Sequence, residues 1–431
     1  MVFYNGDMRL IAIVLAAAFC AAAVPDGDAK QKIKAIKDFS RQGSTGVPSI
    51  AGYLTDASVD VRREAVKTIV GVGGISTLDP LVAASHDNDS EMQIRAVDGM
   101  INFYLPGYVQ KGWMDSARRV GGTVANMFGD QNDQMIDADT PVRPEVTQAV
   151  VRLIGGAASV EARANAARAA GILRARAAVP ALTAALRSKD DGLMFEALIA
   201  LQKIRDVSSG PSVLFLVRDL NEKLQIAAID TVGLLRIADA VPDLKRVVEN
   251  GNKKPRRAAL SALGQIADPS SLTYFQQYLN DKDEGMRAAA AEGIGRVGVP
   301  ADRARVREMF QFERKISLRL SLAFALVGLG EIDEATDGPL RYLSSNLTSR
   351  SWKGVASPFL VELARKPQVR QVIHQMLSSL GDKDELMGLA GVLAASGGKD
   401  SLAPLEQLSR SSDPAVAKEA LRAIRLINTR I

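Results

Sequence analysis

An apolar pattern with a 31-residue period runs through much of the 431-residue chain. Its most regular column is alanine, and the residues three, four and seven positions after each of these alanines are mostly apolar. Positions i, i+3, i+4 and i+7 form one face of an α-helix, so each period predicts a helix with one buried side. The column comprises Ala65, Ala96, Ala166, Ala197, Ala228, Ala259 and Ala290.

A second set of apolar columns keeps the same period and predicts a companion helix in each repeat. Glycines stand near the ends of the alanine-bearing helices and prolines at the starts of their companions, as helix ends and first turns favour. A single helical hairpin cannot bury its apolar stripe, so neighbouring repeats must stack into a solenoid. The companion columns are Leu182, Val213, Leu244, Phe275, Val306 and, four residues later, Leu186, Val217, Val248, Leu279, Phe310.

Three short segments resemble a known family, the HEAT repeats of the short type named after phycobilisome lyases. They read DVRREAV at residues 60–66, AVPAL at 178–182 and SDPAVAKEAL at 412–421. The resemblance covers most of residues 45–431. It implies an all-α fold, a right-handed α-α superhelix of about eleven helical hairpins, and it says little about function because the motif positions pack and cap helices.

The repeat pattern is interrupted once and drifts near the C-terminus. Residues 106–143 break the period and hold Trp113, the pair Gly121-Gly122 and a polar stretch from Gly129 to Asp139, which predicts an insertion. The expected organisation is therefore a signal peptide at 1–23, an N-terminal cap at 24–44 with a helix at 28–40, repeats at 45–105, the insertion at 106–143, regular repeats at 144–310 and divergent repeats at 311–431.

The N-terminus has the pattern of an export signal. An apolar run from Leu10 to Phe19 precedes Ala21-Ala22-Ala23, which fits cleavage before Val24, and a start at Met8 would remove the unfavourable Asp7. These features predict a periplasmic or extracellular protein. The alternative is an uncleaved anchor, although the apolar run is shorter than the roughly 20 residues of a membrane-spanning helix.

The charge does not indicate a nucleic-acid partner. The chain has 54 Lys and Arg against 49 Asp and Glu, and the net charge of +5 is spread along it. The clearest basic stretches, Arg163 to Arg176 and Lys253 to Arg257, are interpreted as solvated helix faces.

The residues needed for common catalytic routes are scarce. The chain has two histidines and one cysteine, and cleavage after Ala23 would remove the cysteine. HEAT-repeat deoxyhypusine hydroxylases bind two irons through repeated His-Glu pairs, but here Asp87 follows His86 and Gln375 follows His374. We therefore predict no catalytic residue, no cofactor and no metal site. A lyase or another enzyme with an unrecognised site is the alternative, and it would have a deep pocket near residues 106–143.

One polar loop raises the question of a metal. Its oxygen-bearing residues do not have the spacing of an EF-hand, which places ligands at positions 1, 3 and 5, a glycine at 6 and a glutamate at 12. We therefore interpret it as an exposed loop. The residues are Asp130, Asn132, Asp133, Asp137 and Asp139.

The face of the alanine-bearing helices that points away from the core is the predicted binding surface. At 100° per residue, it falls about two residues on either side of the column alanine. Solenoids bind extended partners on this concave surface, so we predict a protein or peptide partner and a scaffold function. The alternatives are that these side chains are plain core, or that the chain is a structural subunit of an envelope assembly. The residues are Phe195, Ile199, Ile226, Asp230 and Arg257.

Overall fold

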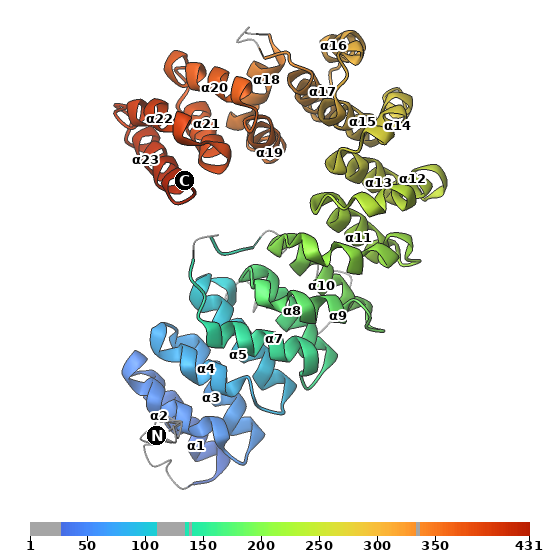
Figure 1. The fold of residues 1–431 in the computed structure, drawn as a ribbon. Coiled ribbons are helices and arrows are strands. Elements are labelled where there is room, and N and C mark those ends of the chain that lie inside the picture. Colours follow the sequence, from blue (N-terminus) through green and yellow to red (C-terminus); the bar gives the residue numbers. More distant parts are fainter. Residues whose placement is uncertain (1–26, 110–133, 138–139, 333–336) are drawn as a thin grey trace, which may run out of the picture. The chain divides into compact units, whose positions relative to one another are not determined.

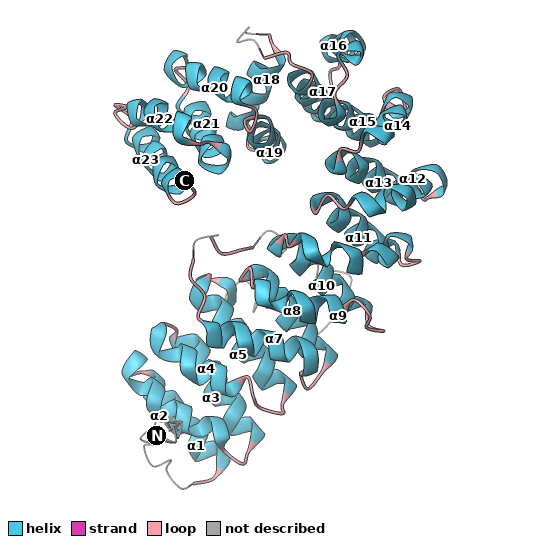
Figure 2. Ribbon diagram, viewed as in Figure 1, coloured by secondary structure: helices cyan, strands magenta, loops and turns pink. Residues whose placement is uncertain are grey.

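The structure is a computed structural model that describes residues 27–109, 134–137, 140–332 and 337–431. Within these ranges the chain forms helices and loops and no strand, as Figure 2 shows. The chain divides into two compact units, unit 1 (Met1–Ala181) and unit 2 (Leu182–Ile431). The predicted all-α class is confirmed, and the division falls inside the stretch predicted as regular repeats.

Unit 1 begins with a single helix and continues with three helix pairs. The single helix, α1 (Ala29–Ser40), lies close to the predicted 28–40 and packs on α3. We call the helix with the column alanine the alanine helix and its partner the companion helix. The pairs, companion first, are α2 (Val47–Ala51) with α3 (Val59–Val72), α4 (Leu78–Ala84) with α5 (Ser90–Tyr104), and α7 (Pro144–Gly156) with α8 (Val160–Ile172).

Unit 2 continues the pairs. The companion α9 (Val179–Ala185), which contains the division, precedes α10 (Asp191–Ile204), and two 3-10 segments, η6 (Val207–Ser212) and η7 (Leu214–Arg218), precede α11 (Glu222–Leu234). There follow α12 (Val241–Asn250) with α13 (Lys253–Ile266), α14 (Leu272–Tyr278) with α15 (Glu284–Val297), α16 (Arg303–Phe312) with α17 (Ile316–Gly328), α18 (Pro339–Ser345) with α19 (Lys353–Leu363), α20 (Pro367–Ser379) with α21 (Lys383–Ser396), and α22 (Leu402–Leu408) with α23 (Pro414–Asn428).

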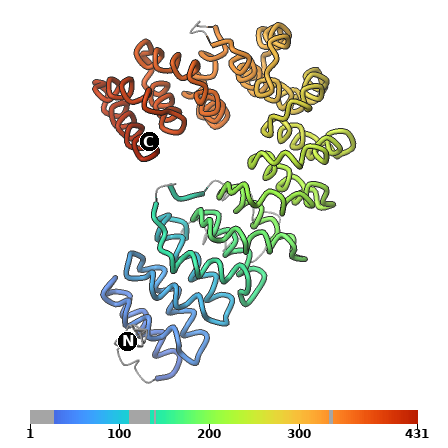
Figure 3. Tube along the Cα trace, viewed as in Figure 1, coloured from blue at the N-terminus to red at the C-terminus, as the bar shows by residue number. Residues whose placement is uncertain are grey.

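The described residues thus form eleven pairs, which agrees with the predicted number. Three pairs lie in unit 1, the next is α9 with α10, and seven more follow α10. The Cα trace reverses at the turn within each pair (Figure 3). In unit 2, α12, α14 and α16 lie on one side of the row, whereas α13, α15 and α17 lie on the other and pack on one another (Figure 1).

The core confirms the predicted columns. All seven column alanines are 0% exposed, and so are the first companion residues Leu182, Val213, Leu244, Phe275 and Val306. Small residues at the alanine column let consecutive alanine helices approach closely. One close approach uses glycine: a Cβ on Gly328 would lie 2.3 Å from the backbone oxygen of Gly295, so α17 can contact α15 there only without a side chain.

The end of the alanine helix also repeats every 31 residues. Arg205, Arg236 and Ala267 adopt left-handed backbone conformations with φ of 58°, 54° and 60°, and Gly298 takes the same place after α15 with φ of 49°. A left-handed residue here closes the helix and redirects the chain toward the next companion helix.

One companion element is not an α-helix. Residues 207–218 form η6 and η7, although Val213 and Val217 occupy the predicted buried positions. Pro211 alone does not explain this difference, because Pro180 and Pro242, 31 residues before and after it, stand in the first turns of the α-helices α9 and α12. The apolar spacing therefore predicted the buried side correctly but not the helix type.

The described residues include only short parts of the predicted insertion and none of the predicted signal peptide. Residues 134–137 and 140–143 form no helix, and the Ile136 amide donates to the carbonyl oxygen of Ile172 at 3.1 Å. Residues 1–23, Trp113 and the pair Gly121-Gly122 lie outside the described residues, as do Asp130, Asn132, Asp133 and Asp139.

Candidate functional site

The five residues of the predicted binding surface lie on three alanine helices of unit 2. Phe195 and Ile199 belong to α10, Ile226 and Asp230 to α11, and Arg257 to α13. Helix α11 packs on both α10 and α13, so the structure places the five residues on consecutive helices. Phe195, Ile226 and Asp230 are half-buried, Ile199 is buried at 7% exposure, and Arg257 is exposed.

Arg257 has a structural partner within the chain. It is the fifth residue of α13, and its guanidinium donates to both carboxylate oxygens of Asp283, the N-cap of α15, at 2.7 and 2.9 Å. Arg63, the fifth residue of α3, pairs in the same way with Asp89, the N-cap of α5. The fifth position of an alanine helix can therefore hold an ion pair that ties one repeat to the next.

The same position on α10 and α11 is apolar. Phe195 and Ile226 are the fifth residues of these helices, and the N-caps that follow them are Asn221 and Asn252 instead of aspartates. Neither α10 nor α11 therefore has an arginine–aspartate link at this position. Asn221 instead donates to Asp191 at 2.7 Å. Phe195 and Ile226 together are called the apolar strip below.

A cation already lies against this strip. The ammonium nitrogen of Lys223 is 4.0 Å from the centroid of the Phe195 ring, a cation–π distance. Burial lowers the pKa of Lys223, and the charge of Glu196 partly opposes that shift. Lys223, Ile226 and Asp230 have i, i+3 and i+7 spacing, so they share one face of α11.

Asp230 differs from the other acids at its position, the ninth residue of an alanine helix. Asp98 on α5 accepts a hydrogen bond from Asn165 at 3.1 Å, and Glu292 on α15 accepts one from Ser321 at 2.9 Å. Among the described residues, the side chain of Asp230 has no hydrogen-bond or ion-pair partner. Burial raises the pKa of its carboxyl group to about 6.

Sequence reasoning missed a second polar cluster in unit 2. Arg296 on α15 donates to both carboxylate oxygens of Glu362 on α19, at 2.7 and 2.9 Å, and lies 3.6 Å from Glu292. Its guanidinium also lies over the ring of Phe324, 4.7 Å from the centroid. Burial raises the pKa of Glu292, although the charge of Arg296 opposes the shift. The cluster connects α15 with α17 and α19.

The basic stretches have largely structural partners. Arg163 and Arg256, each the fourth residue of its helix, donate to the carbonyl oxygens of Ile154 and Val248, near the ends of their companion helices. Lys253 pairs with Asp283 at 3.0 Å and Lys254 with Glu222 at 3.4 Å. These contacts account for much of the charge there without an anionic partner.

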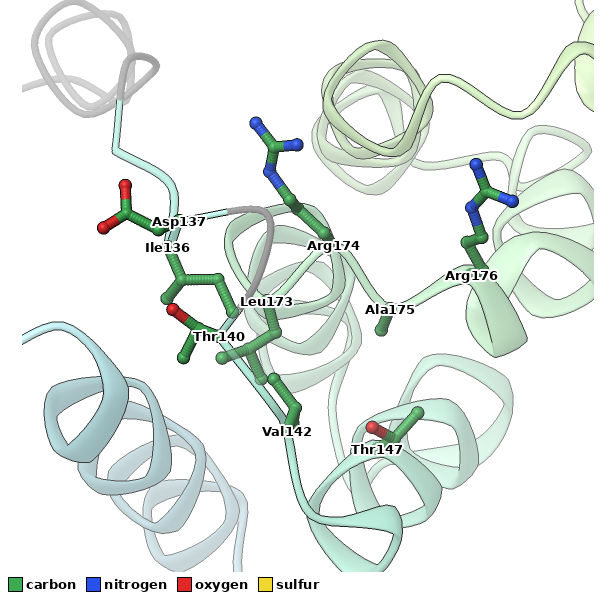
Figure 4. Close-up of a pocket in the computed structure, with 9 residues that line it drawn as sticks. All are labelled: Ile136, Asp137, Thr140, Val142, Thr147, Leu173, Arg174, Ala175 and Arg176. Carbon is green, nitrogen blue, oxygen red and sulfur yellow. The ribbon is translucent and has the colours of Figure 1, made fainter. Parts of the chain in front are cut away.

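A small pocket lies beside the described end of the insertion, in unit 1. It has a volume of about 240 Å³, below the usual 300–1,000 Å³ of small-molecule sites. Figure 4 shows Ile136, Leu173 and Val142 close together, with Thr147 apart from them. In this view the side chains of Arg174 and Arg176 extend away from Thr147. The remaining lining residues are Asp137, Thr140 and Ala175.

The described ranges contain no cluster of three or more His, Cys, Asp or Glu side chains that could hold a metal ion. None of the helices in the described part of the chain is both long enough and apolar enough to cross a bilayer. His374 shares a 2.9 Å hydrogen bond with Ser401, and burial lowers the pKa of His374.

Comparison with known proteins agrees with this geometry. A family model described as HEAT repeats matches residues 211–295 and 247–327, which run from before α11 to the penultimate residue of α17. Together with the paired helices and the buried columns, this match identifies the chain as a helical-repeat protein. Within residues 211–327 the repeats match the HEAT type. No curated protein matches the sequence significantly.

Three solved structures have some similarity to the chain. The complex of CpcE and CpcF of phycocyanin lyase from Nostoc is 18% identical with a TM-score of 0.36, covering 63% of this chain and 94% of its own. The Escherichia coli protein YibA is 12% identical with a TM-score of 0.41, covering 70% and 98%. An engineered protein is 18% identical with a TM-score of 0.32, covering 94% and 99%. Scores this low support no argument about activity.

Proposed function

We propose that this chain is an exported HEAT-repeat scaffold without catalytic activity, which binds another protein or an extended peptide on the alanine-helix face of unit 2. In this proposal Phe195, Ile226 and Asp230 contact the partner. The buried Ile199, one helical turn after Phe195, supports the position of the Phe195 side chain, and Arg257 lies at the edge of the surface. The export pattern at Leu10–Ala23 supports a periplasmic or extracellular location.

Two half-buried apolar residues on adjacent helices, Phe195 and Ile226, next to the carboxylate of Asp230, carry this proposal. At the fifth position of α13 and α3, an arginine pairs with the N-cap aspartate of the next alanine helix and links two repeats. At the same position α10 and α11 have Phe195 and Ile226, and the N-caps of the next alanine helices are asparagines. Half-buried apolar residues add little to a core, but they contribute strongly to binding when a partner covers them.

Site-directed photo-crosslinking tests the proposed surface. A photoreactive phenylalanine analogue at position 195 should form a discrete crosslinked product in cells that secrete the protein. The matched control is the same analogue at Ala288, the fifth residue of α15, which is also half-buried. An equal yield of the same products from both positions would contradict the proposal.

The Phe195→Asp variant provides a second readout. We expect it to retain a cooperative melting transition and to lose the crosslinked partner, because binding would bury the new charge against apolar groups of the partner at a large desolvation cost. A variant that no longer melts cooperatively would place Phe195 in the core and end the proposal. Fractionation of cells that express the chain tests export, and a wholly cytoplasmic product would contradict that part.

A further inference from the structure

We propose that Asp230 binds a lysine or arginine side chain of the partner, so that the scaffold selects peptide segments in which a basic residue stands near an apolar one. This inference rests on the proposed function and adds the chemistry of the bound segment.

The first argument is the missing partner of Asp230. Asp98 and Glu292, the acids at the same helical position, each receive a hydrogen bond from a neighbouring helix, whereas Asp230 receives none from the described residues. A partly buried carboxylate without a partner is costly in the folded chain. A positive group supplied from outside would offset that cost through a charge-assisted hydrogen bond.

The second argument is the balance of charge around Asp230. Burial alone shifts its pKa, with no contribution from a nearby cation, so Lys223 and Arg257 do not neutralise it. Arg257 is held by Asp283, and the ammonium of Lys223 lies over the Phe195 ring. The negative charge of Asp230 is therefore available to a ligand, and an acidic ligand would be repelled from it.

The third argument is the apolar surface next to the carboxylate. Ile226 precedes Asp230 by one helical turn, and Phe195 lies on the adjacent helix α10. The long aliphatic stem of a lysine or arginine packs well on such residues while its charged end reaches the carboxylate. A neighbouring apolar side chain of the ligand would cover Phe195.

Selection from a random library of 12-residue peptides, carried out on the full chain at pH 7.5, tests the inference. We expect lysine or arginine to be enriched next to an apolar residue. Binding of a selected peptide, measured by calorimetry, should weaken about tenfold or more in Asp230→Asn, the change expected for loss of a hydrogen bond to a charged group. It should remain unchanged in the control Ala288→Asp.

The outcomes separate the two proposals. Peptides that bind with a dependence on Phe195, but equally well to the Asp230→Asn variant, would overturn the role of Asp230 and leave the binding surface intact. If no peptide is selected, or if the selected peptides ignore Phe195→Asp, both proposals are wrong.

A proton measurement gives an independent readout. A cation bound to Asp230 should lower the pKa of its carboxyl group, so near pH 6 binding should release protons, detected as a buffer-dependent heat. The Asp230→Asn variant should release fewer protons. Equal proton release by both proteins would contradict the inference.

Discussion

Arg296 and Glu362, 66 residues apart, form a two-point ion pair that links α15 to α19 and passes over α17. The Arg296 side chain is 10% exposed and that of Glu362 is 29% exposed. Solenoid repeats usually contact only their nearest neighbours. This pair adds a direct link between repeats that are not adjacent.

Removing the acid from this pair should destabilise unit 2. We expect Glu362→Gln to lower the free energy of unfolding by about 1–3 kcal/mol, because Arg296 would lose both charged hydrogen bonds while it remains largely buried. Glu419→Gln is the matched control, since its pair with Arg422 is more exposed and should contribute less than about 0.5 kcal/mol. Denaturant titration measures both free energies of unfolding. Equal losses in the two variants would mean that burial of the Arg296–Glu362 pair does not increase its contribution to stability.

The carboxyl of Asp230 should make the protein less stable at neutral pH. Its pKa is about 6 in the folded chain against 3.8 for an unperturbed aspartate, so between these pH values the folded state binds more protons than the unfolded state. Stability from this group therefore rises as pH falls from 7 toward 4. The ionised group costs up to about 3 kcal/mol at pH 7.

The Asp230→Asn variant tests this cost. It should be more stable than the unmodified chain at pH 7, and the difference should shrink as pH falls through 6. The exposed Asp239→Asn is the control and should change stability little. Urea unfolding at pH 4.5, 6 and 7.5 measures the effect, and a less stable Asp230→Asn at pH 7.5 would show that an unrecognised partner holds this carboxylate.

Replacing either of two helical glycines by alanine should change the stability of the protein in opposite directions. A Cβ on Gly293 would lie 2.4 Å from the ring of the fully buried Phe275, so Gly293→Ala should cost about 1–3 kcal/mol. A Cβ on Gly391 would meet only Glu419, at 3.7 Å, so Gly391→Ala should stabilise α21 by about 0.5–1 kcal/mol. Thermal melting distinguishes them, and a neutral Gly293→Ala would show that Phe275 can move.

Replacing Ala267 by glycine should make the folded protein more stable. Its φ of 60° places it in the left-handed region, where a Cβ is unfavourable. Ala267→Gly should therefore stabilise the chain by about 0.5–1 kcal/mol, whereas Ala258→Gly, within α13, should destabilise it by a similar amount. Two variants with the same sign of effect in chemical denaturation would contradict this explanation.

The sequence predicted the repeat well because its strongest signal is local. The 31-residue columns place Ala228 and Leu244 in the core, and both are fully buried. The type of the element around Pro211 was not predicted, because spacing shows which side of a segment is buried and not whether its turns are α or 3-10.

The candidate site was predicted less completely. Helical spacing placed Phe195, Ile226 and Asp230 on one surface, and their role in binding stays a prediction. The partner of Arg257 could have been found from the sequence by comparing it with Arg63 and its N-cap Asp89, since the spacing of 26 residues recurs in Arg257 and Asp283. The link from Arg296 to Glu362 had no such signal, because it joins a regular repeat to one in which the period has drifted.

The left-handed residue that closes each alanine helix also bears on how the number of repeats can change. From Arg205 to Gly298, this residue recurs at an unchanged interval of 31. Recombination between two genes misaligned by one repeat in this stretch would add or delete a whole hairpin and keep every helix ending in place. A similar exchange between positions 296 and 362 would alter the distance that the Arg296–Glu362 pair must cross. The constant interval would therefore tolerate a change in repeat number between Arg205 and Gly298, whereas such a change between 296 and 362 would break the Arg296–Glu362 link.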